Sequence, residues 1–386
     1  MCVSQTIIVS NRLPVSVRKT KNGIELYPSS GGLATGLSSY ASQRNNLWIG
    51  WPGVVSDDLT EKDKRHITQK LAGYNCQPVF LSQKQLDAYY NGYSNSILWP
   101  FLHNLDADFT ASARYWKAYR EVNEAFLGAV LALSNTKATV WVHDYQLFLL
   151  PQLLRKQRPD AHIGFFLHIP FPEAGHFVKL DQATLIIKGI LGADLVGFHT
   201  TDYAKGFLDS CQQLTSATPI EGGVALKERA VRVAEFPMGI DNVKFSSAIR
   251  ARKVQLELNK LTRRYLGKKI ILTVDRLDPT KGFVERLRAY KEFLRSNPKI
   301  QGKVVMLMLA VPSREEIPAY RTLKVRVEKE VNAINRKFGT LTWNPIVYMH
   351  KSVSFEELSA LYRVADVAFV APIKDGMNLV AKEYVA

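Results

Sequence analysis

The sequence predicts an α/β fold with two doubly wound, Rossmann-like domains that face a cleft. Short apolar runs alternate with longer segments of helical periodicity along the 386 residues, which is typical of parallel sheets covered by helices. Most runs end in polar residues, as strands do where an open α/β sheet binds its ligand. The stretch 235–245 contains proline and glycine without clear periodicity and separates two such series. We therefore expect one domain at 1–240 and a second at 241–386.

The first half opens with a strand, TIIVS (6–10), that ends in Asn11 and Arg12. A polar stretch follows, in which we expect a hairpin or a loop. Gly31 and Gly32 then precede a helix-like segment. Paired glycines let backbone N–H groups approach a ligand closely, although an isolated Gly-Gly pair is more often just a turn.

Aromatic residues concentrate in the next part of the chain. An aromatic strand is expected at 47–53 (LWIGWPG), and Tyr89, Tyr90, Trp99 and Phe101 follow among polar residues. Such a cluster is either core or a sugar-binding surface. For any single member, core is the default interpretation.

Three later apolar runs each end in a histidine, at His143, His168 and His199, and Asp144 follows the first of them. Histidines at three successive strand ends indicate a shared cleft. A single histidine in such a place commonly has a structural hydrogen-bonding role, so the pattern does not assign chemistry to all three. Their spacing does not match an H-E-x-x-H zinc site.

The second half opens with the most informative segment, KIILTVDRLDPTKGF (269–283). Its β-branched run predicts a buried strand, and helical spacing resumes after the loop. Arg276 and Lys281 therefore lie between the end of a strand and the start of a helix, a place that favours anions. Two cations there suggest a phosphate or diphosphate. The alternative is two solvated surface cations.

The last runs of the second half lead into Arg314 and into Asp375-Gly376. A helix that starts near Asn378 would place Glu383 about two turns along it. A carboxylate at that position could accept hydrogen bonds from ribose hydroxyls. The alternative is an ordinary glutamate on a helix surface.

Composition and charge limit the function classes. The net charge of +16 lies mostly in the second half, which has 28 basic and 15 acidic residues from Asp241 onward, against 23 and 20 before it. This excess would attract an anionic ligand. Lysine and arginine are spread among helices without a nucleic-acid-binding signature, so we expect no nucleic acid as partner. No apolar run is long enough to span a membrane. The first residues do not resemble a signal peptide and the three cysteines are scattered, so we expect a cytoplasmic protein.

Several common nucleotide and hydrolase motifs are missing from the sequence. It has no G-x-x-x-x-G-K-[ST] loop, no G-x-G-x-x-G after the first strand and no G-x-S-x-G elbow. P-loop nucleotidases, dinucleotide oxidoreductases and α/β-hydrolases are therefore disfavoured.

A set of segments distributed along the whole chain carries a family resemblance. In order they are 10–15 (SNRLPV), 31–33 (GGL), 90–100, 141–145 (WVHDY), 168–172 (HIPFP), 197–200 (GFHT), 276–278 (RLD), 281–282 (KG), 312–314 (PSR) and 375–383 (DGMNLVAKE). In this combination the sequence resembles the trehalose-6-phosphate synthases of glycosyltransferase family 20. That resemblance implies a GT-B fold, with the acceptor on the first domain and the nucleotide sugar on the second.

The resemblance implies a retaining glucosyltransferase. Glucose would pass from UDP-glucose, or another nucleoside-diphosphate glucose, to glucose 6-phosphate, giving α,α-trehalose 6-phosphate. The alternatives are a related transferase or pseudoglycosyltransferase with another phosphorylated acceptor, and a non-catalytic sugar-phosphate sensor.

The resemblance also implies roles for individual residues. The acceptor residues are Arg12, Tyr90, Trp99 and Arg314 around the phosphate and Asp144 on the sugar. The donor residues are Gly31, Gly32, Arg276, Lys281, Asp375, Gly376, Met377, Asn378, Leu379, Val380, Ala381, Lys382 and Glu383, with Glu383 on the ribose. The catalytic residues are His168, Arg276, Lys281 and Asp375, of which His168 and Asp375 contact the donor sugar.

No metal or other cofactor is expected. Breaking the bond from sugar to phosphate builds negative charge on the leaving diphosphate, and fixed cations can stabilise it. Arg276 and Lys281 would replace a divalent ion, and the sequence has no convincing D-x-D metal motif. The family path implies front-side attack in place of a carboxylate nucleophile.

Some positions depart from the family pattern and leave the acceptor and the nucleotide base open. They are Gln146, 173–177 (EAGHF) and Pro279. The sequence ends at Ala386, soon after the expected nucleotide-binding helix begins, so we expect a second domain that is truncated. A homo-oligomer and a fused or separate trehalose-phosphate phosphatase stay open as partners.

Overall fold

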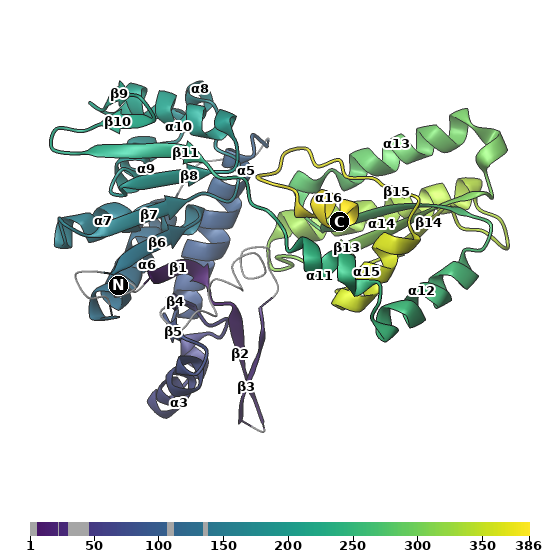
Figure 1. Cartoon of the computed structure of the whole chain (residues 1–386), viewed down its shortest axis with the longest axis horizontal. Coiled ribbons are helices and arrows are strands. Elements are labelled where there is room, and N and C mark those ends of the chain that lie inside the picture. The colour runs from purple at the N-terminus through teal and green to yellow at the C-terminus, as the bar shows by residue number, and fades with distance from the viewer. Residues whose placement is uncertain (1–5, 22, 30–45, 106–111, 134–137) are drawn as a thin grey trace. The chain divides into compact units, whose positions relative to one another are not determined.

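The computed structural model describes residues 6–21, 23–29, 46–105, 112–133 and 138–386. The chain divides into two compact units, Met1–Met238 (unit 1) and Gly239–Ala386 (unit 2) (Figure 1). Each unit is an α/β structure, and each is described by itself. None of the described helices is long and apolar enough to cross a membrane.

Unit 1 is built on a sheet that has nine strands within the described residues, in the order β5-β4-β1-β6-β7-β8-β11-β10-β9. The strands are β1 (Thr6–Arg12), β4 (Asn46–Trp51), β5 (Cys76–Pro78), β6 (Thr139–His143), β7 (His162–Phe166), β8 (Leu195–Phe198), β9 (Thr218–Ile220), β10 (Gly223–Ala225) and β11 (Ala230–Glu235). All pairs are parallel except those that β10 makes with β9 and β11. The expected polar stretch after β1 is a hairpin of β2 (Val15–Thr20) and β3 (Gly23–Pro28).

Helices cover this sheet because their apolar faces pack against its strands. They are α3 (Glu61–Ala72), α4 (Gln83–Gln85), α5 (Trp99–Leu102), α6 (Ala113–Leu133), α7 (Leu150–Gln157), α8 (Ala174–Phe177), α9 (Ala183–Ile190) and α10 (Thr201–Leu214), with short 3-10 turns η1 (Ser56–Asp58) and η3 (Tyr145–Leu147). The segment η2 (Leu86–Leu98) is a π-helix. Such helices are rare and are often found at functional sites.

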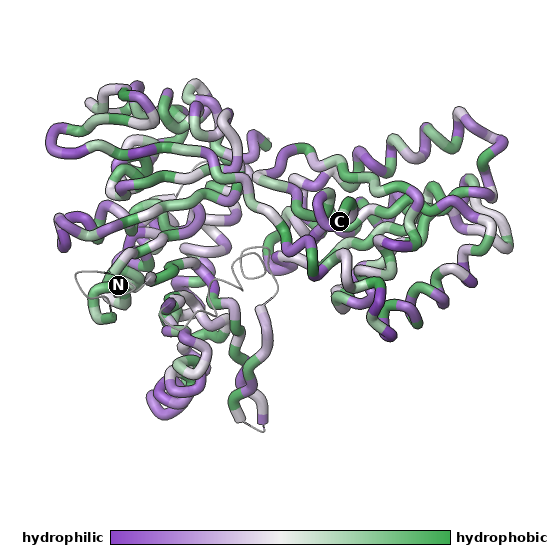
Figure 2. The backbone as a smooth tube through the Cα atoms, viewed as in Figure 1, coloured by the Kyte–Doolittle hydropathy of each residue, from purple (hydrophilic) through white to green (hydrophobic). Residues whose placement is uncertain are grey.

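Unit 2 has a parallel sheet in the order β14-β13-β12-β15. Its strands are β12 (Lys269–Arg276), β13 (Val304–Val311), β14 (Ile346–Met349) and β15 (Val367–Ala368), and its helices are α11 (Asn242–Ala248), α12 (Arg252–Arg264), α13 (Phe283–Ser296), α14 (Pro318–Phe338), α15 (Phe355–Val364) and α16 (Leu379–Val385), with η4 (Pro279–Lys281) and η5 (Pro298–Ile300). Nearly all of β13 is buried, and Figure 2 shows this central part of the unit as mainly hydrophobic. An almost continuous apolar strand is what a sheet covered on both faces requires.

The strand order reverses once in the parallel part of each sheet. In unit 1 the chain adds β4 and β5 on one side of β1 and then crosses to β6 on the other. In unit 2 it adds β13 and β14 on one side of β12 and then crosses to β15. Ligands of doubly wound sheets bind at the carboxyl ends of the strands at such a switch point. We therefore expect candidate site residues at the carboxyl ends of β1 and β6 in unit 1, and of β12 and β15 in unit 2.

Some predicted elements were wrong in detail. The last apolar run before Asp375 forms only the two-residue strand β15. Glu383 is the fifth residue of α16, so it lies about one and a half turns along the helix and not two.

Candidate active site

The loop after β12 is shaped by local hydrogen bonds and one glycine. Asp278 caps η4 by accepting the Thr280 N–H at 3.0 Å. Gly282 then adopts φ +64° and a β-carbon there would lie 2.6 Å from the Ala371 carbonyl oxygen. Only glycine allows both the left-handed backbone and this close approach. The loop from β12 therefore packs directly against the loop that follows β15.

Backbone hydrogen bonds join the same two loops. The N–H of Ile373 donates to the Thr280 carbonyl at 2.8 Å, and the N–H of Lys374 donates to it at 3.4 Å. The residues on either side, Lys281 and Asp375, then meet across the switch point. Segments far apart in sequence are thereby held in one fixed geometry.

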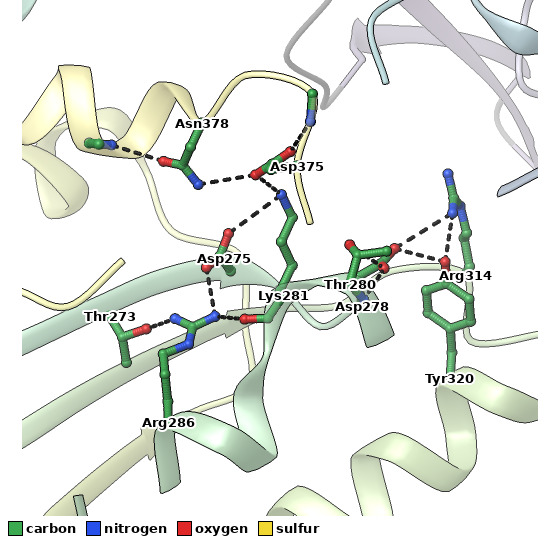
Figure 3. A network of polar contacts seen from close by, with 12 residues as sticks. Thr273, Asp275, Asp278, Thr280, Lys281, Arg286, Arg314, Tyr320, Asp375 and Asn378 are labelled. Atoms are coloured by element: carbon green, nitrogen blue, oxygen red, sulfur yellow. Dashed lines mark hydrogen bonds and ion pairs between the residues drawn. The ribbon is translucent and has the colours of Figure 1, made fainter. Parts of the chain in front are cut away.

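Lys281 lies between two carboxylates (Figure 3). Its Nζ forms an ion pair with Asp375 and lies 3.8 Å from Oδ1 of Asp275. The Lys281 side chain is only 9% exposed, so solvent screens these charges weakly. The alternative interpretation, two solvated surface cations, is therefore wrong for Lys281. Arg276, at the end of β12, is exposed.

A second cation, Arg286 on α13, lies beneath this pair and was not predicted. Arg286 Nη2 donates to Oδ2 of Asp275 at 2.7 Å, and the guanidinium also donates to the Thr273 hydroxyl and to the backbone carbonyl of Lys281. Burial raises the pKa of Asp275, and Arg286 and Lys281 oppose that shift. The sequence could have indicated that Arg286 is buried, because it falls on the same helix face as the buried Phe283.

Arg314 follows β13 and has a left-handed backbone, with φ 48°. Its Nη1 donates to the Tyr320 hydroxyl at 2.6 Å and lies 3.6 Å from Oδ2 of Asp278. Burial by itself would raise the pKa of Asp278, but Arg314, Arg276 and hydrogen bonds from Thr280 and Tyr320 lower it to about 2. The structure thus places the predicted Arg314 beside the β12 loop.

The predicted nucleotide segment, 375–383, forms the loop after β15 and the start of α16. Asp375 accepts hydrogen bonds from the Gly376 N–H at 3.0 Å and from Asn378 Nδ2 at 3.2 Å. Asn378 in turn caps the helix by accepting the Ala381 N–H at 3.0 Å. Asn378 thus connects the Lys281–Asp375 pair to the first turn of the helix. The other predicted residues of the segment, Met377, Leu379, Val380 and Lys382, are half-buried there.

Glu383 is held by a single tyrosine. Its Oε2 accepts the Tyr362 hydroxyl at 2.6 Å. Burial raises the pKa of Glu383, with Tyr362 and Lys244 opposing the shift. The half-buried, bonded carboxylate differs from an ordinary helix-surface glutamate.

Beside the switch point of unit 1, after β6 and β7, the predicted Asp144 and His168 are joined. The His168 N–H donates to Oδ1 of Asp144 at 3.2 Å, and Asp144 has a left-handed backbone with φ 74°. Non-glycine residues in that conformation are concentrated at functional sites. The three strand-end histidines do gather, because the His168 ring lies 5.2 Å from that of His143 and 5.5 Å from that of His199.

His143 was not among the predicted site residues. Its Nδ1 lies 3.0 Å from Nε2 of His168. Burial lowers the pKa of His143 to about 3, and burial, followed by the effects of His143 and His199, lowers the pKa of His168. Both rings are therefore neutral at pH 7. The signal for His143 was its place at a strand end beside Asp144.

Arg12 and Tyr90 share one aromatic neighbour. The Arg12 guanidinium lies over the Trp51 ring at 5.2 Å, and the Tyr90 ring lies 6.3 Å from the same ring. Gly53, with φ +85°, leaves space for this contact, because its β-carbon would lie 3.0 Å from Arg12 Nη2. Trp51, at the end of β4, was seen in the sequence only as part of an aromatic strand.

The aromatic cluster left open between core and surface proves to be mostly core. Tyr89 and Tyr93 are fully buried on η2, whereas Tyr90 is half-buried. Trp99 is 6% exposed and packs 5.7 Å from the Tyr145 ring. Trp99 is therefore largely part of the core. Gly31 and Gly32 lie outside the described residues.

The departures from the family pattern occupy ordered positions. Gln146 is buried, and its carbonyl accepts a hydrogen bond from Asn123 at 3.1 Å. His176 of α8 lies 3.1 Å from the Phe101 carbonyl. Pro279 is the first residue of η4, where its fixed φ and missing N–H are tolerated. Proline therefore fits this loop without disturbing Lys281.

No group of three or more histidine, cysteine, aspartate or glutamate side chains among the described residues could hold a metal ion. The charged groups instead neutralise one another. At the unit 2 switch point, two cations and two carboxylates alternate from Arg286 through Asp275 and Lys281 to Asp375. Such a buried, fixed arrangement can receive negative charge without reorganising.

Comparison with known proteins identifies the family. The model of the family described as glycosyltransferase family 20 matches residues 4–386. The chain belongs to glycosyltransferase family 20. It is 43% identical over 381 residues to a protein of Dictyostelium discoideum named alpha,alpha-trehalose-phosphate synthase [UDP-forming] A, covering 98% of this chain and 51% of that protein. It is 42% identical over 387 residues to alpha,alpha-trehalose-phosphate synthase [UDP-forming] 2 of Aspergillus niger, covering 98% and 80%.

Several solved structures have a similar fold. A UDP-forming alpha,alpha-trehalose-phosphate synthase of Burkholderia xenovorans in complex with glucose-6-phosphate has a TM-score of 0.84 and 31% identity, covering 99% of this chain and 82% of that one. An Escherichia coli structure bound with UDP-2-fluoro glucose has a TM-score of 0.86 and 31% identity, covering 99% and 81%. The N-terminal domain of Candida albicans trehalose-6-phosphate phosphatase has a TM-score of 0.89 and 29% identity, covering 99% and 80%. The predicted GT-B fold is therefore confirmed.

Proposed function

We propose that this family 20 chain transfers glucose from UDP-glucose to glucose 6-phosphate with retention, giving α,α-trehalose 6-phosphate. The observation that carries the proposal is the buried Lys281–Asp375 pair at the switch point of unit 2. The relatives are named UDP-forming synthases and are 42–43% identical to this chain. Their names support both the proposed reaction and uracil as the nucleotide base of the donor. The chain spans about half of the Dictyostelium protein and four fifths of the Aspergillus protein.

In this proposal Lys281 and Arg276 stabilise the diphosphate as it leaves. The Lys281 ammonium is held by Asp375, and Arg286 holds the Lys281 backbone. The cation therefore needs no reorganisation when negative charge develops on the phosphate oxygen. Asp375 and the start of α16 hold the donor, with Glu383 on the ribose.

Each unit has its own candidate acceptor residues. In unit 1, Arg12 would bind the acceptor phosphate, with Tyr90 and Trp99 beside it, and Asp144 the sugar hydroxyls. In unit 2, Arg314 would bind the acceptor phosphate. Arg12 has a preferred direction because it stacks on Trp51. His168 contacts the donor sugar as a neutral ring, which suits a group that forms a hydrogen bond to a hydroxyl.

The test is a product assay with UDP-, GDP- and ADP-glucose, each with glucose 6-phosphate, followed by mass spectrometry and proton NMR. We expect a phosphorylated disaccharide with an α,α linkage and release of UDP. Glucose without phosphate, and fructose 6-phosphate, are the acceptor controls. If none of the donors gives a disaccharide phosphate with glucose 6-phosphate, the proposed reaction is wrong. A product with another sugar phosphate favours the related transferase.

A second candidate is a sugar-phosphate sensor without turnover. The likeness to the N-terminal domain of a protein named as a phosphatase favours it. It would bind glucose 6-phosphate in calorimetry and form no product in the assay above. A metal-free reaction, cytoplasmic location, homo-oligomers and a phosphatase partner stay predictions.

A further inference from the structure

One buried carboxylate, that of Asp278, connects the loop that carries Lys281 to Tyr320 of α14 and to Arg314, which lies between β13 and α14. Oδ1 of Asp278 accepts the Thr280 N–H at 3.0 Å and the Thr280 hydroxyl at 2.9 Å. Oδ2 accepts the Tyr320 hydroxyl at 2.7 Å and lies 3.6 Å from Arg314 Nη1. The Asp278 side chain is fully buried. Each oxygen of this carboxylate therefore serves a different loop (Figure 3).

Tyr320 acts as the link to Arg314. A phenol carries one hydrogen, and here it is donated to Asp278, so a lone pair accepts from Arg314 Nη1 at 2.6 Å. Burial raises the pKa of Tyr320, so the hydroxyl stays protonated. The chain from Arg314 through Tyr320 to Asp278 has one consistent direction of hydrogen donation.

The backbone conformation of Arg314 indicates why this residue needs to be held by the link. At φ 48° a residue with a β-carbon is in a sparsely populated conformation. Such conformations persist where surrounding contacts hold them. A guanidinium held in advance loses less entropy when it binds an anion.

We propose that Tyr320 and Asp278 are positioning residues that orient Arg314 for the acceptor phosphate and couple it to the loop of the donor diphosphate. This inference rests on the proposed function, which assigns the phosphate to Arg314. It predicts that mutation can separate the effects of the hydrogen bonds made by the two oxygens of Asp278. Tyr320→Phe removes the link on the acceptor side, and Thr280→Val removes a hydrogen bond on the donor side.

The kinetic test compares three variants. Tyr320→Phe should raise KM for glucose 6-phosphate about tenfold, the effect of one lost positioned hydrogen bond, and leave KM for UDP-glucose and kcat within about threefold. Thr280→Val should raise KM for UDP-glucose instead. Asp278→Asn should raise both. Unchanged KM for glucose 6-phosphate in Tyr320→Phe would overturn the inference.

A matched control and a double-mutant cycle separate positioning from loss of stability. Tyr290→Phe removes another buried phenol, whose hydroxyl donates to the Pro345 carbonyl at 3.1 Å, and should leave both KM values unchanged. In an Arg314→Ala background, Tyr320→Phe should have no further effect on KM, because its action passes through Arg314. An undiminished effect in that background would show a merely structural role.

Calorimetric titration with glucose 6-phosphate tests the role of Tyr320 by binding alone, without turnover. A wild type that binds glucose 6-phosphate but forms no product refutes the proposed reaction, and the change in Kd in Tyr320→Phe still decides the role of Tyr320. A wild type that does not bind glucose 6-phosphate overturns both proposals.

Discussion

The switch point of unit 2 and the strand ends beside the switch point of unit 1 have opposite chemistry. In unit 2 the ends of β12 and β15 bring together charged side chains, with Lys281 between Asp275 and Asp375. In unit 1 the ends of β6 and β7 bring together two neutral rings, His143 and His168. Topology thus determines where a site forms, and the side chains at the strand ends determine whether that site is charged or neutral.

The comparison also predicts how each site fails. A buried ion pair that loses one member leaves an uncompensated charge, which is strongly unfavourable. A buried neutral histidine is instead sensitive to protonation, because burial disfavours its charged form. Unit 2 should therefore be sensitive to mutation of a partner, and unit 1 to acid.

The largest effect is expected for Arg286→Leu. It leaves Asp275 buried without its closest cation, and should reduce the free energy of unfolding of unit 2 by about 3–5 kcal/mol. The measurement is urea unfolding followed by circular dichroism. The double variant Arg286→Leu, Asp275→Leu should recover most of the loss. If the single variant is as stable as the wild type, the charged network does not stabilise unit 2.

The next effect concerns catalysis. Lys281→Ala should lower kcat by about 100-fold or more, the effect of losing one preorganised group that stabilises the leaving charge. Steady-state assays with UDP-glucose and glucose 6-phosphate measure this. The control is Lys291→Ala, an exposed lysine of α13, which should keep wild-type kcat. Near-normal turnover of Lys281→Ala would remove the proposed role.

A pH-dependent effect distinguishes unit 1. The pKa of His143 is lowered to about 3 in the folded chain from about 6.5 when unfolded, so its neutral form contributes stability above pH 6.5 that is lost as the pH falls toward 3. Between pH 7.5 and pH 5 this loss is about 2 kcal/mol. The corresponding window for Asp278, whose pKa is lowered to about 2, begins only below about pH 4.

Tryptophan fluorescence can follow this acid loss, because five of the six tryptophans precede residue 238. His143→Gln should reduce the pH dependence between pH 7.5 and pH 5 without abolishing it, because His168, whose pKa is also lowered by burial, remains. An equal loss in the wild type and the variant would mean that another group is responsible.

The smallest effect tests the aromatic support of Arg12. Trp51→Phe weakens a cation–π contact worth about 0.5–1 kcal/mol, so KM for glucose 6-phosphate should rise about threefold with kcat unchanged. Trp48→Phe is the control, because Trp48 is buried in a separate cluster and donates to Ser10 at 2.7 Å. An unchanged KM in Trp51→Phe would show that Arg12 does not depend on this ring.

Sequence patterns were enough to predict the α/β class and to place Arg276, Lys281 and Asp375 in loops after strands. These features depend on local periodicity and on polar residues after apolar runs, which can be read within a short window. The strand-end histidines were found in the same way. The assigned functions of these residues came from family resemblance and not from the pattern.

Which of these side chains meet depends on the order of the strands in the folded unit. The pairing of Lys281 with Asp375 joins residues 94 positions apart, and it depends on β12 and β15 being neighbours. The roles of Arg286, Tyr320 and His143 were missed because each looks like an ordinary helix or strand residue until its partner is known. Ion pairs and hydrogen bonds depend on distances of a few ångströms, and strand order, which sets those distances, follows from packing of the whole unit.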